Sequence, residues 1–449
     1  MWNYFDCNRY HVQYVCMTQT TRESGNDARP GLDGNGFTVL GISGRRLAAV
    51  LIGWFFVIFD GYDLIVYGTV QSSLMREWGL NSAQLGTIGS MAFIGMMLGA
   101  VLIGRLSDRV GRKTAVIGSV LMLSVFTLLC GIATNPLLFG LFRLLAGLGL
   151  GGLVPAVNAM TADLVPTRKM AAWSTVMMSG VPLGGSLAAV LAQFIVPSHE
   201  VYGWRIMFLI ALVPIVVGLP IAIKVIPSDK EIVHDLEARG ISTPDASDKT
   251  KAPGFGALFA PAYRTATIWF ALATFVTLLA WYGLGTWLPR LMEEQGYNLG
   301  AALNFTLALN IGAVIGSIVT AWAGDRFGPL ISGCVAAGIA GIALLVLLVG
   351  PPVSAIYAIL VLAGVGTHGT QILIIAAVAQ FYPQRLRGTG LGWALGVGRL
   401  GAVIAPQMAG LLLSWGLGPE SSYLMFGGAA LLSAISMFFL YLLAKKDRS

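Results

Sequence analysis

The chain has 449 residues, of which 56% are hydrophobic and 11% are charged, and its mean hydropathy is +0.76. About a quarter of the residues of soluble proteins are charged, so this composition argues against a water-soluble enzyme. The 28 basic and 21 acidic residues leave a nucleic acid or a membrane as the partner, and the positions of the basic residues decide between them. The four cysteines lack CxxC or CxH spacing, which indicates neither a disulfide framework nor a metal site.

The N-terminal tail, residues 1–46, is polar and lacks the apolar segment of a cleavable signal peptide. We therefore expect the first apolar run to stay in the protein as an anchor. Residues 1–16 are unusually aromatic, and Met17 is an alternative start, in which case residues 1–16 would not be native.

Twelve apolar runs follow, each long enough for a helix that crosses a bilayer core about 30 Å thick. The longest interior polar stretch, 226–264, separates an N-terminal half, 47–225, from a C-terminal half, 265–444, with a short tail at 445–449. This pattern predicts an all-α membrane protein of twelve transmembrane helices in two six-helix halves. The predicted spans are 47–70, 84–104, 114–133, 137–160, 172–195, 205–225, 265–288, 299–322, 330–350, 353–380, 388–414 and 422–444.

The polar stretch 226–264 is expected to be a cytoplasmic linker. Ser228 and Glu231 have the spacing of a capping box, and apolar residues follow, so one short helix is predicted there. Residues 244–253, which begin and end with proline, are expected to form a flexible connector.

The basic residues divide unevenly between the two sides of the predicted bundle. With the N-terminus in the cytoplasm, 23 of the 28 Lys and Arg residues lie on the cytoplasmic side and three on the outer side. The other two, Arg143 and Arg399, lie inside spans. This distribution predicts a multi-pass protein of the plasma (inner) membrane with both termini in the cytoplasm. The lipid bilayer, and not a nucleic acid, is then the partner of the basic loops.

Four short motifs recur 217 residues further along the chain. Such repetition across corresponding spans indicates two halves descended from one unit, an architecture of transporters with a binding site between the halves. The glycine pairs are expected to be helix-packing positions. The pairs are Gly95-xxx-Gly99 with Gly312-xxx-Gly316, Asp108-Arg109-x-Gly111 with Asp325-Arg326-x-Gly328, Ala146-Gly147-x-Gly149 with Ala363-Gly364-x-Gly366, and Pro166-x-Arg168 with Pro383-x-Arg385.

Two of these regions resemble a known family. The ten residues from Gly104 to Lys113, GRLSDRVGRK, resemble the loop 2-3 signature of the major facilitator superfamily. The run Arg143-xxx-Gly147-x-Gly149 resembles the fourth-helix motif of the same superfamily. The resemblance covers the chain from residue 47 onward and implies the major facilitator fold.

The first span narrows the resemblance to one family within the superfamily. Its Asp60-Gly61-Tyr62-Asp63 is similar to the motif of the aromatic acid:proton symporters, which carry benzoate and hydroxybenzoates.

The sequence departs from the superfamily's pattern at two places. Loop 8-9 has Pro329-Leu330 where the first half has Arg112-Lys113, and span 5 lacks the spacing of the antiporter motif, which argues against a drug:proton antiporter.

Asp60 and Asp63 are acidic residues at membrane depth and share a helix face. Two carboxylates so close in a low dielectric cannot both ionise easily, so we expect them to carry protons. In the alternative interpretation, both are locked in ion pairs with arginines.

Arg143 and Arg399 could each grip a carboxylate through two parallel hydrogen bonds, or act as counter-ions to the aspartates. Aromatic and polar residues at depth could stack on a ring or bind its substituents, although buried histidines and interfacial aromatics also occur without a function. The candidate substrate-binding residues are Arg399, Arg143, Tyr62, Tyr67, Trp281, Tyr282, His368 and Gln371, and ring hydroxyls could be detected by Asn158, Asn304, Asn310, Gln371 or Thr277.

Acidic and basic residues alternate at the cytoplasmic helix ends. Topology alone needs only the basic ones, so the acids suggest ion pairs that hold the cytoplasmic side closed, a latch that the resemblance also implies. The candidate gating residues are Gly104, Asp108, Arg109, Gly111, Arg112, Lys113, Asp163, Arg168, Trp322, Asp325 and Arg326.

These features together predict a secondary transporter that imports an aromatic carboxylate, such as gentisate or benzoate, with protons. No GxxxxGK[ST] loop for ATP and no HExxH zinc motif occur, and neither catalytic residues nor a cofactor are expected. A proton-driven drug antiporter is the alternative. An intramembrane aspartyl protease is a remote one, because Asp325 lies in a basic loop without the GxGD form. The transporter is expected to be a monomer.

Overall fold

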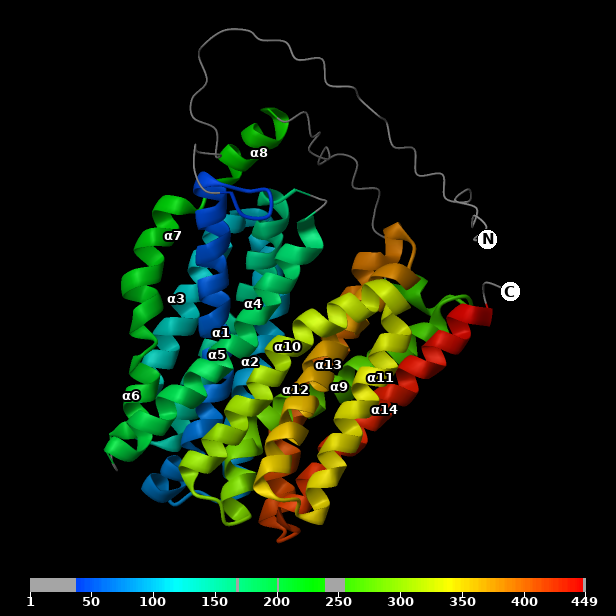
Figure 1. Cartoon of the computed structure of the whole chain (residues 1–449). Coiled ribbons are helices and arrows are strands. Elements are labelled where there is room, and N and C mark those ends of the chain that lie inside the picture. The colour runs from blue at the N-terminus through cyan, green and yellow to red at the C-terminus, as the bar shows by residue number, and fades with distance from the viewer. Residues whose placement is uncertain (1–37, 167–168, 200–201, 239–254, 447–449) are drawn as a thin grey trace. The chain divides into compact units, whose positions relative to one another are not determined.

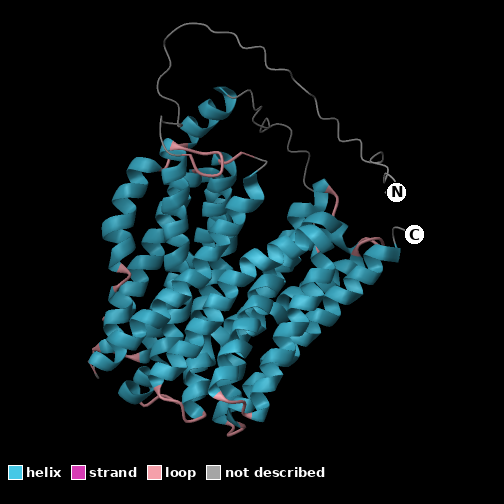
Figure 2. Cartoon of the chain, in the orientation of Figure 1, coloured by secondary structure: helices cyan, strands magenta, loops and turns pink. Residues whose placement is uncertain are grey.

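The computed structural model describes residues 38–166, 169–199, 202–238 and 255–446, and the side chains of 104–110, 171, 235–238, 384 and 446 are outside that description. The described residues are almost entirely helical (Figure 2). Their one β feature is an isolated bridge between Val39 and Ile42. The predicted tail segment 1–37 and connector 244–253 lie outside the described residues.

The N-terminal half contains the helices α1 to α7, which lie together in Figure 1. Its sixth span is interrupted after Leu209, because Pro214 lacks the N–H that would bond to the carbonyl of Ile210, and a π-helical turn begins at Pro214. The elements are α1 (Gly44–Trp78), α2 (Ser82–Val110), α3 (Arg112–Gly131), α4 (Pro136–Leu164), α5 (Met170–Ser198), α6 (Gly203–Leu209), the π-helical turn η2 (Pro214–Gly218) and α7 (Leu219–Val225).

The C-terminal half follows the short helix α8 (Asp229–Ala238) and a 3-10 turn, η3 (Phe255–Phe259). Its ninth span ends in a second 3-10 turn, η4 (Leu347–Val349). The helices are α9 (Arg264–Glu294), α10 (Leu299–Phe327), α11 (Pro329–Val346), α12 (Val353–Phe381), α13 (Gln384–Ser414) and α14 (Gly418–Lys446).

Twelve helices among the described residues are long and apolar enough to cross a membrane, as predicted. Several extend beyond the predicted spans. Helix α1 continues past residue 70 to Trp78, because Gln71 and Ser73 are buried in the bundle and do not end the helix. Gly79, with a φ of 62°, then closes it in the left-handed conformation that favours glycine.

The sequence repeat is also a repeat of contacts. A methyl group on Gly95 in α2 would lie 2.0 Å from the carbonyl oxygen of Leu144 in α4. At the equivalent position in α10, a methyl group on Gly312 would lie 2.2 Å from the carbonyl oxygen of Val361 in α12. Both partners, like both glycines, are 217 residues apart, so the predicted packing role of the glycine pairs is confirmed.

We call the end of the bundle where α1 begins and α8 lies the linker side, and the opposite end the far side (Figure 1). On the far side, one hydrophobic cluster joins both halves and contains Phe139 and Trp204 with Trp287 and Phe426. Towards the linker side, the core divides into a cluster centred in the N-terminal half and a cluster within the C-terminal half. The halves therefore share their apolar core mainly on the far side.

Helix α8 is attached to the N-terminal half. Its predicted capping box is confirmed, because the backbone N–H of Ser228 donates to Glu231 Oε2 at 2.7 Å. Arg45 in α1 donates to both Glu231 oxygens, at 2.7 and 3.3 Å. The Arg45 guanidinium, with help from the Ser228 backbone, lowers the pKa of Glu231 to about 2. The first turn of α8 is thus tied to the start of α1.

A second contact fixes the same helix to the predicted loop signature. Asp229 accepts a hydrogen bond from the backbone N–H of Arg112 at 2.9 Å. The preceding Gly111 has a φ of 91°, and a methyl group there would collide with the Asp229 carboxylate. Both the backbone conformation and the close carboxylate explain why a glycine occupies this position.

Candidate functional site

Asp63 in α1 and Arg143 in α4 form an ion pair in the middle of the N-terminal half. Arg143 Nη1 donates to Asp63 Oδ2 at 2.7 Å, and Thr127 Oγ1 in α3 donates to Asp63 Oδ1 at 2.5 Å. Both charged side chains are 2% exposed. Since a buried charge is stable only when it is paired and hydrogen-bonded, Asp63 and Arg143 compensate each other's charge, while Arg143 Nε has no partner among the described residues.

Asp60 lies one helical turn before Asp63 but differs in its surroundings. It is fully buried, and neither carboxylate oxygen has a hydrogen-bond partner among the described residues. Arg399 in α13 interacts with it electrostatically across the two halves without forming an ion pair. Arg399 instead donates to the carbonyl oxygen of Met96 in α2, at 2.6 Å. The site therefore holds one carboxyl group and one guanidinium that are not bonded to each other.

Two candidate tyrosines are bonded to the protein backbone. Tyr62 donates to the carbonyl oxygen of Met207 in α6 at 2.7 Å, and Tyr67 donates to that of Leu85 in α2 at 2.6 Å. Both are 1% exposed. Arg143 also lies over the Tyr67 ring, with 5.6 Å from its guanidinium carbon to the ring centre. In this conformation both hydroxyls tie helices of the N-terminal half together.

The aromatic candidates of the C-terminal half lie closer to Asp60 and Arg399. Tyr282 in α9 interacts electrostatically with both groups, and its ring centre is 5.0 Å from that of Phe93 in α2. Trp281 packs against His368 in α12, with ring centres 5.0 Å apart. His368 is buried, and its nitrogens have no hydrogen bond of standard geometry to the described residues.

A small cavity lies between the halves at Trp281 and Tyr282. Leu64, Ile65 and Val181 from the N-terminal half line it, together with Trp281, Tyr282, Gly285 and Asn310 from the C-terminal half. It has room for about one water molecule. Gln371, the last candidate, is half-buried in α12 and does not line this cavity.

Two contacts of the site had no signal in the sequence. Thr127, which binds Asp63, is one of several hydroxyl residues in its span, and only the fold selects it. The carbonyl of Met96, which receives Arg399, is a backbone group and carries no residue signature. Both contacts depend on how neighbouring helices are rotated.

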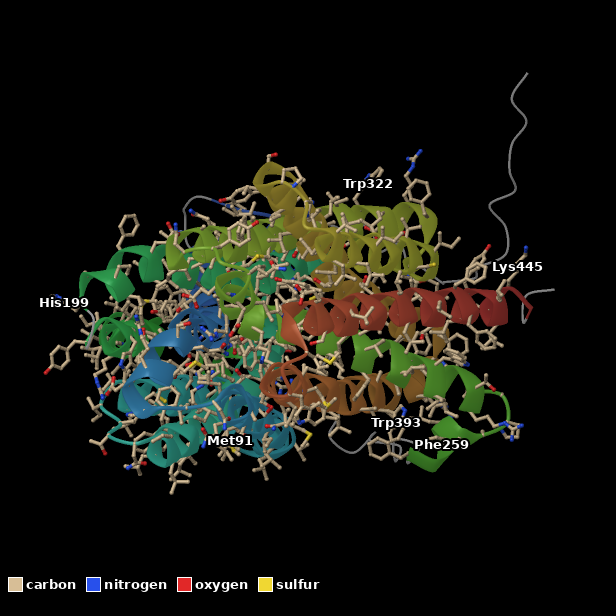
Figure 3. All side chains as sticks on the ribbon, turned by 90° about the horizontal axis from the view of Figure 1, so that it is seen from below. Met91, His199, Phe259, Trp322, Trp393 and Lys445 are labelled. Carbon is tan, nitrogen blue, oxygen red and sulfur yellow. The ribbon has the colours of Figure 1, made fainter. Side chains whose placement is uncertain are left out.

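Part of the predicted latch can be placed. Arg112 Nε lies 3.6 Å from Asp163 Oδ2, and Lys113 donates to the carbonyl of Ile223, all within the N-terminal half. Asp325 and Arg326 are exposed at the linker end of α10. The exposed Trp322 projects at the edge of the bundle in Figure 3. The side chains of Gly104, Asp108 and Arg109 and all of Arg168 lie outside the described residues.

The hydrogen bonds between the halves, as far as the described residues show them, lie from the middle of the bundle to the far side. Thr87 donates to Gln407 at 2.8 Å, and Gln193 donates to Asn304 at 2.9 Å. Ser72 also bonds to Glu293. These bonds and the shared apolar cluster hold the halves together on the far side.

Twelve transmembrane helices among the described residues, in two repeated halves with charged side chains buried at depth, have the architecture of a membrane transporter. The chain belongs to the Major Facilitator Superfamily, which it matches over residues 53–406 and, in a second overlapping match, 302–449.

Within the superfamily, the chain groups with transporters of aromatic acids and not with enzymes. It is 70% identical over 429 residues to the gentisate transporter of Corynebacterium glutamicum, covering 96% of this chain and 95% of that protein. It is 35% identical over 416 residues to the benzoate transport protein of Acinetobacter baylyi, covering 87% and 88%. The predicted family is therefore confirmed.

Solved structures support the fold. The crystal structure of a D-xylose-proton symporter matches with a TM-score of 0.70 at 18% identity, covering 87% of this chain and 97% of that one. An inward-facing bacterial homologue of the lysosomal transporter Spinster matches with a TM-score of 0.68 at 20% identity, covering 90% and 98%. The predicted major facilitator fold is thus confirmed.

Proposed function

We propose that this chain is a monomeric transporter that imports an aromatic carboxylate of the gentisate type together with protons. The names of its relatives, above all the gentisate transporter at 70% identity, support the substrate. The observation that supports the proton coupling is the buried Asp60, whose carboxylate has no hydrogen bond to any described residue. It interacts electrostatically with Arg399, which donates to the backbone oxygen of Met96. Asp63, by contrast, is fully engaged by Arg143 and Thr127.

The orientation follows from the basic residues. The sequence predicts 23 of the 28 Lys and Arg residues on the cytoplasmic side, and described members of this set, such as Arg45 in α1 and Lys230 in α8, lie at the linker side. We therefore assign the linker side to the cytoplasm and the far side to the outside of the plasma membrane. The interhalf bonds on the far side then close the site to the outside. Alternating access requires these bonds to break and the linker side to close.

Arg399 is the proposed anchor of the substrate carboxylate. A guanidinium offers two parallel donors that match a carboxylate, and Arg399 gives one of its donors to the carbonyl of Met96, a weaker acceptor than an anion. Arg143 is already occupied by Asp63. Tyr282, beside Arg399, is placed to contact the aromatic ring, and Trp281, His368 and Gln371 form its wider surroundings.

Charge counting links the substrate to the proton. Asp63 and Arg143 cancel each other, so the unbalanced charges at depth are Asp60 and Arg399. When an arriving carboxylate neutralises Arg399, an ionised Asp60 is left as an uncompensated buried charge, which costs several kcal/mol. Asp60 then takes up a proton, and release of the substrate to the cytoplasm restores its attraction to Arg399 and frees the proton.

This cycle moves one proton with each monoanion and therefore no net charge. The pH gradient then drives uptake with about 1.4 kcal/mol per pH unit. A second proton would add about 2.3 kcal/mol per 100 mV of membrane potential. The ion pair of Asp63 with Arg143 favours the stoichiometry of one, because Asp63 has a permanent counter-charge.

The latch residues of the linker side are proposed to act when the site is open to the outside. In the present conformation Asp325 and Arg326 are exposed, as expected for a latch that is not engaged. The proposed latch residues of the N-terminal half are Gly104, Asp108, Arg109, Gly111, Arg112, Lys113, Asp163 and Arg168, and those of the C-terminal half are Trp322, Asp325 and Arg326.

The function is tested by uptake of labelled gentisate into cells that lack their own carrier and express this chain. We expect accumulation that unlabelled gentisate and benzoate compete with and that an uncoupler abolishes. Uptake that the uncoupler leaves unchanged would contradict proton coupling. The absence of uptake of any aromatic acid, with the chain present in the membrane, would contradict the transport function.

A further inference from the structure

The amide oxygen of Asn310 is a buried hydrogen-bond acceptor without a partner. Asn310 in α10 is 1% exposed, and its Nδ2 donates to the carbonyl of Thr306 at 2.9 Å, one turn earlier in the same helix. That bond fixes which end of the amide points away from the helix. Its Oδ1 has no hydrogen bond to any described residue, and a buried acceptor without a partner is unfavourable.

Asn310 is one of the residues that line the small cavity between the halves. The cavity is also lined by Tyr282, which interacts with both Asp60 and Arg399, and by Leu64, which lies one turn after Asp60 on the same face of α1. The polar groups around this cavity thus differ chemically. Arg399 and Asp60 are a guanidinium and a carboxyl group, whereas the Asn310 amide oxygen is an uncharged acceptor.

The amide oxygen of Asn310 lies against Gly185, a glycine of the opposite half. A methyl group on Gly185 in α5 would lie only 2.2 Å from Asn310 Oδ1. The absence of a side chain at Gly185 therefore makes room for the amide oxygen where α5 and α10 meet. Separation of the halves at this contact would enlarge the cavity around that oxygen.

We propose that Asn310 Oδ1 accepts a hydrogen bond from a ring hydroxyl of the substrate and thereby sets a preference for hydroxylated over unsubstituted benzoates. This inference rests on the proposed function. A buried acceptor without a protein partner favours a ligand that donates a hydrogen bond to it over an analogue that lacks the donor.

The chemistry of gentisate, 2,5-dihydroxybenzoate, indicates which hydroxyl is read. Its 2-hydroxyl lies beside the carboxylate and donates to it within the molecule. Its 5-hydroxyl, meta to the carboxylate, has no internal partner and points away from the group that Arg399 binds. Asn310 therefore reads the meta hydroxyl, which 3-hydroxybenzoate also carries and which benzoate and 2-hydroxybenzoate lack.

Competition with the exchange of labelled gentisate in proteoliposomes tests the assignment, with benzoate, 2-hydroxybenzoate and 3-hydroxybenzoate as competitors. In the wild type, 3-hydroxybenzoate should compete better than the other two. In Asn310→Ala this advantage should shrink about 3- to 10-fold, the worth of one hydrogen bond. Thr306→Ala is the matched control, since its buried hydroxyl bonds within α10 to the carbonyl of Ala302.

A second variant, in the other half, tests the role of Asn310 Oδ1 without changing Asn310. Gly185→Ala must displace the Asn310 amide and should reduce the 3-hydroxybenzoate advantage without changing Asn310 itself. The ratio between competitors does not depend on how much protein folds. An unchanged ratio in Asn310→Ala, or an equal loss in Thr306→Ala, would overturn the assignment. If the proposed function itself is wrong, the wild type will exchange none of the acids. That result is distinct from a failure of the Asn310 assignment, in which the wild type still exchanges them.

Discussion

Asp60 and Asp63 are three residues apart in one helix, yet the fold gives them different chemistry. Asp63 has a guanidinium at 2.7 Å and a hydroxyl at 2.5 Å, so its burial is compensated. Asp60 has neither, and its nearest compensation is Arg399 on the other half. Asp63 thus has the partners of a structural ion pair, and Asp60, which lacks them, is the proposed proton carrier.

The ion pair predicts an effect on stability. Asp63→Asn leaves Arg143 as an uncompensated buried charge, which should cost about 3 to 5 kcal/mol of unfolding free energy. Adding Arg143→Gln should recover much of that loss, because no buried charge is left. Thermal unfolding of the purified variants in detergent measures this, with Asp60→Asn as the control that should unfold no earlier than the wild type. Equal stability of Asp63→Asn and the wild type would contradict the pairing.

Arg399→Lys tests the carboxylate anchor. Lysine keeps the charge but cannot make the planar two-point contact, so most uptake should be lost, by about 10-fold or more if one charged hydrogen bond disappears. Initial rates of gentisate uptake measure it. Arg76→Lys, at an exposed position on the far side, is the control and should transport normally. Near-normal uptake by Arg399→Lys would leave Arg399 as a simple counter-ion.

At the scale of elements, the glycines of α2 and α10 and the attachment of α8 decide how helices meet. Gly95 and Gly312 bring paired helices within contact of each other's backbone at equivalent places in the two halves. Helix α8 is tied to α1 through Arg45 with Glu231 and to α3 through Arg112 with Asp229. These contacts attach the described part of the linker helix to the N-terminal half.

The glycine contacts predict parallel effects in the two halves. Gly95→Ala and Gly312→Ala each place a methyl group within 2.2 Å of a backbone oxygen, so each should destabilise the protein by about 1 to 3 kcal/mol. Gly118→Ala in α3, where a methyl group meets nothing within 4 Å, should be neutral or slightly stabilising. Thermal unfolding separates the three, and a harmless Gly95→Ala would contradict the close packing of α2 on α4.

The attachment of α8 to α1 should weaken at acidic pH. Because the folded pKa of Glu231 is lowered to about 2, its contact with Arg45 is fully present above the ordinary glutamate pKa, near 4.5, and is lost as the pH falls towards 2. Glu231→Gln imitates the protonated form at neutral pH. A spin label at Lys230→Cys should become mobile in that variant and stay restrained in Glu294→Gln, whose partner Arg290 lies on the far side. A restrained label in Glu231→Gln would contradict the attachment.

For the whole molecule, the sequence predicts the architecture better than the site. Length and hydropathy define twelve spans, and the 217-residue offset predicts contacts such as Gly95 with α4 and Gly312 with α12. The roles of Arg143 and Arg399 stay open in the sequence, because both lie at depth and both match a carboxylate. Only the rotation of α4 places Arg143 on Asp63, and only the crossing of α13 over α2 brings Arg399 to the carbonyl of Met96.

The most direct measurement compares the wild type with Asp60→Asn in proteoliposomes under an imposed pH gradient, alkaline inside. The wild type should concentrate labelled gentisate until the gradient is collapsed by a protonophore. Asp60→Asn should still exchange labelled for unlabelled gentisate across the membrane, because Arg399 is intact, but it should not concentrate it. Accumulation of gentisate by Asp60→Asn to the wild-type level would contradict proton coupling through Asp60.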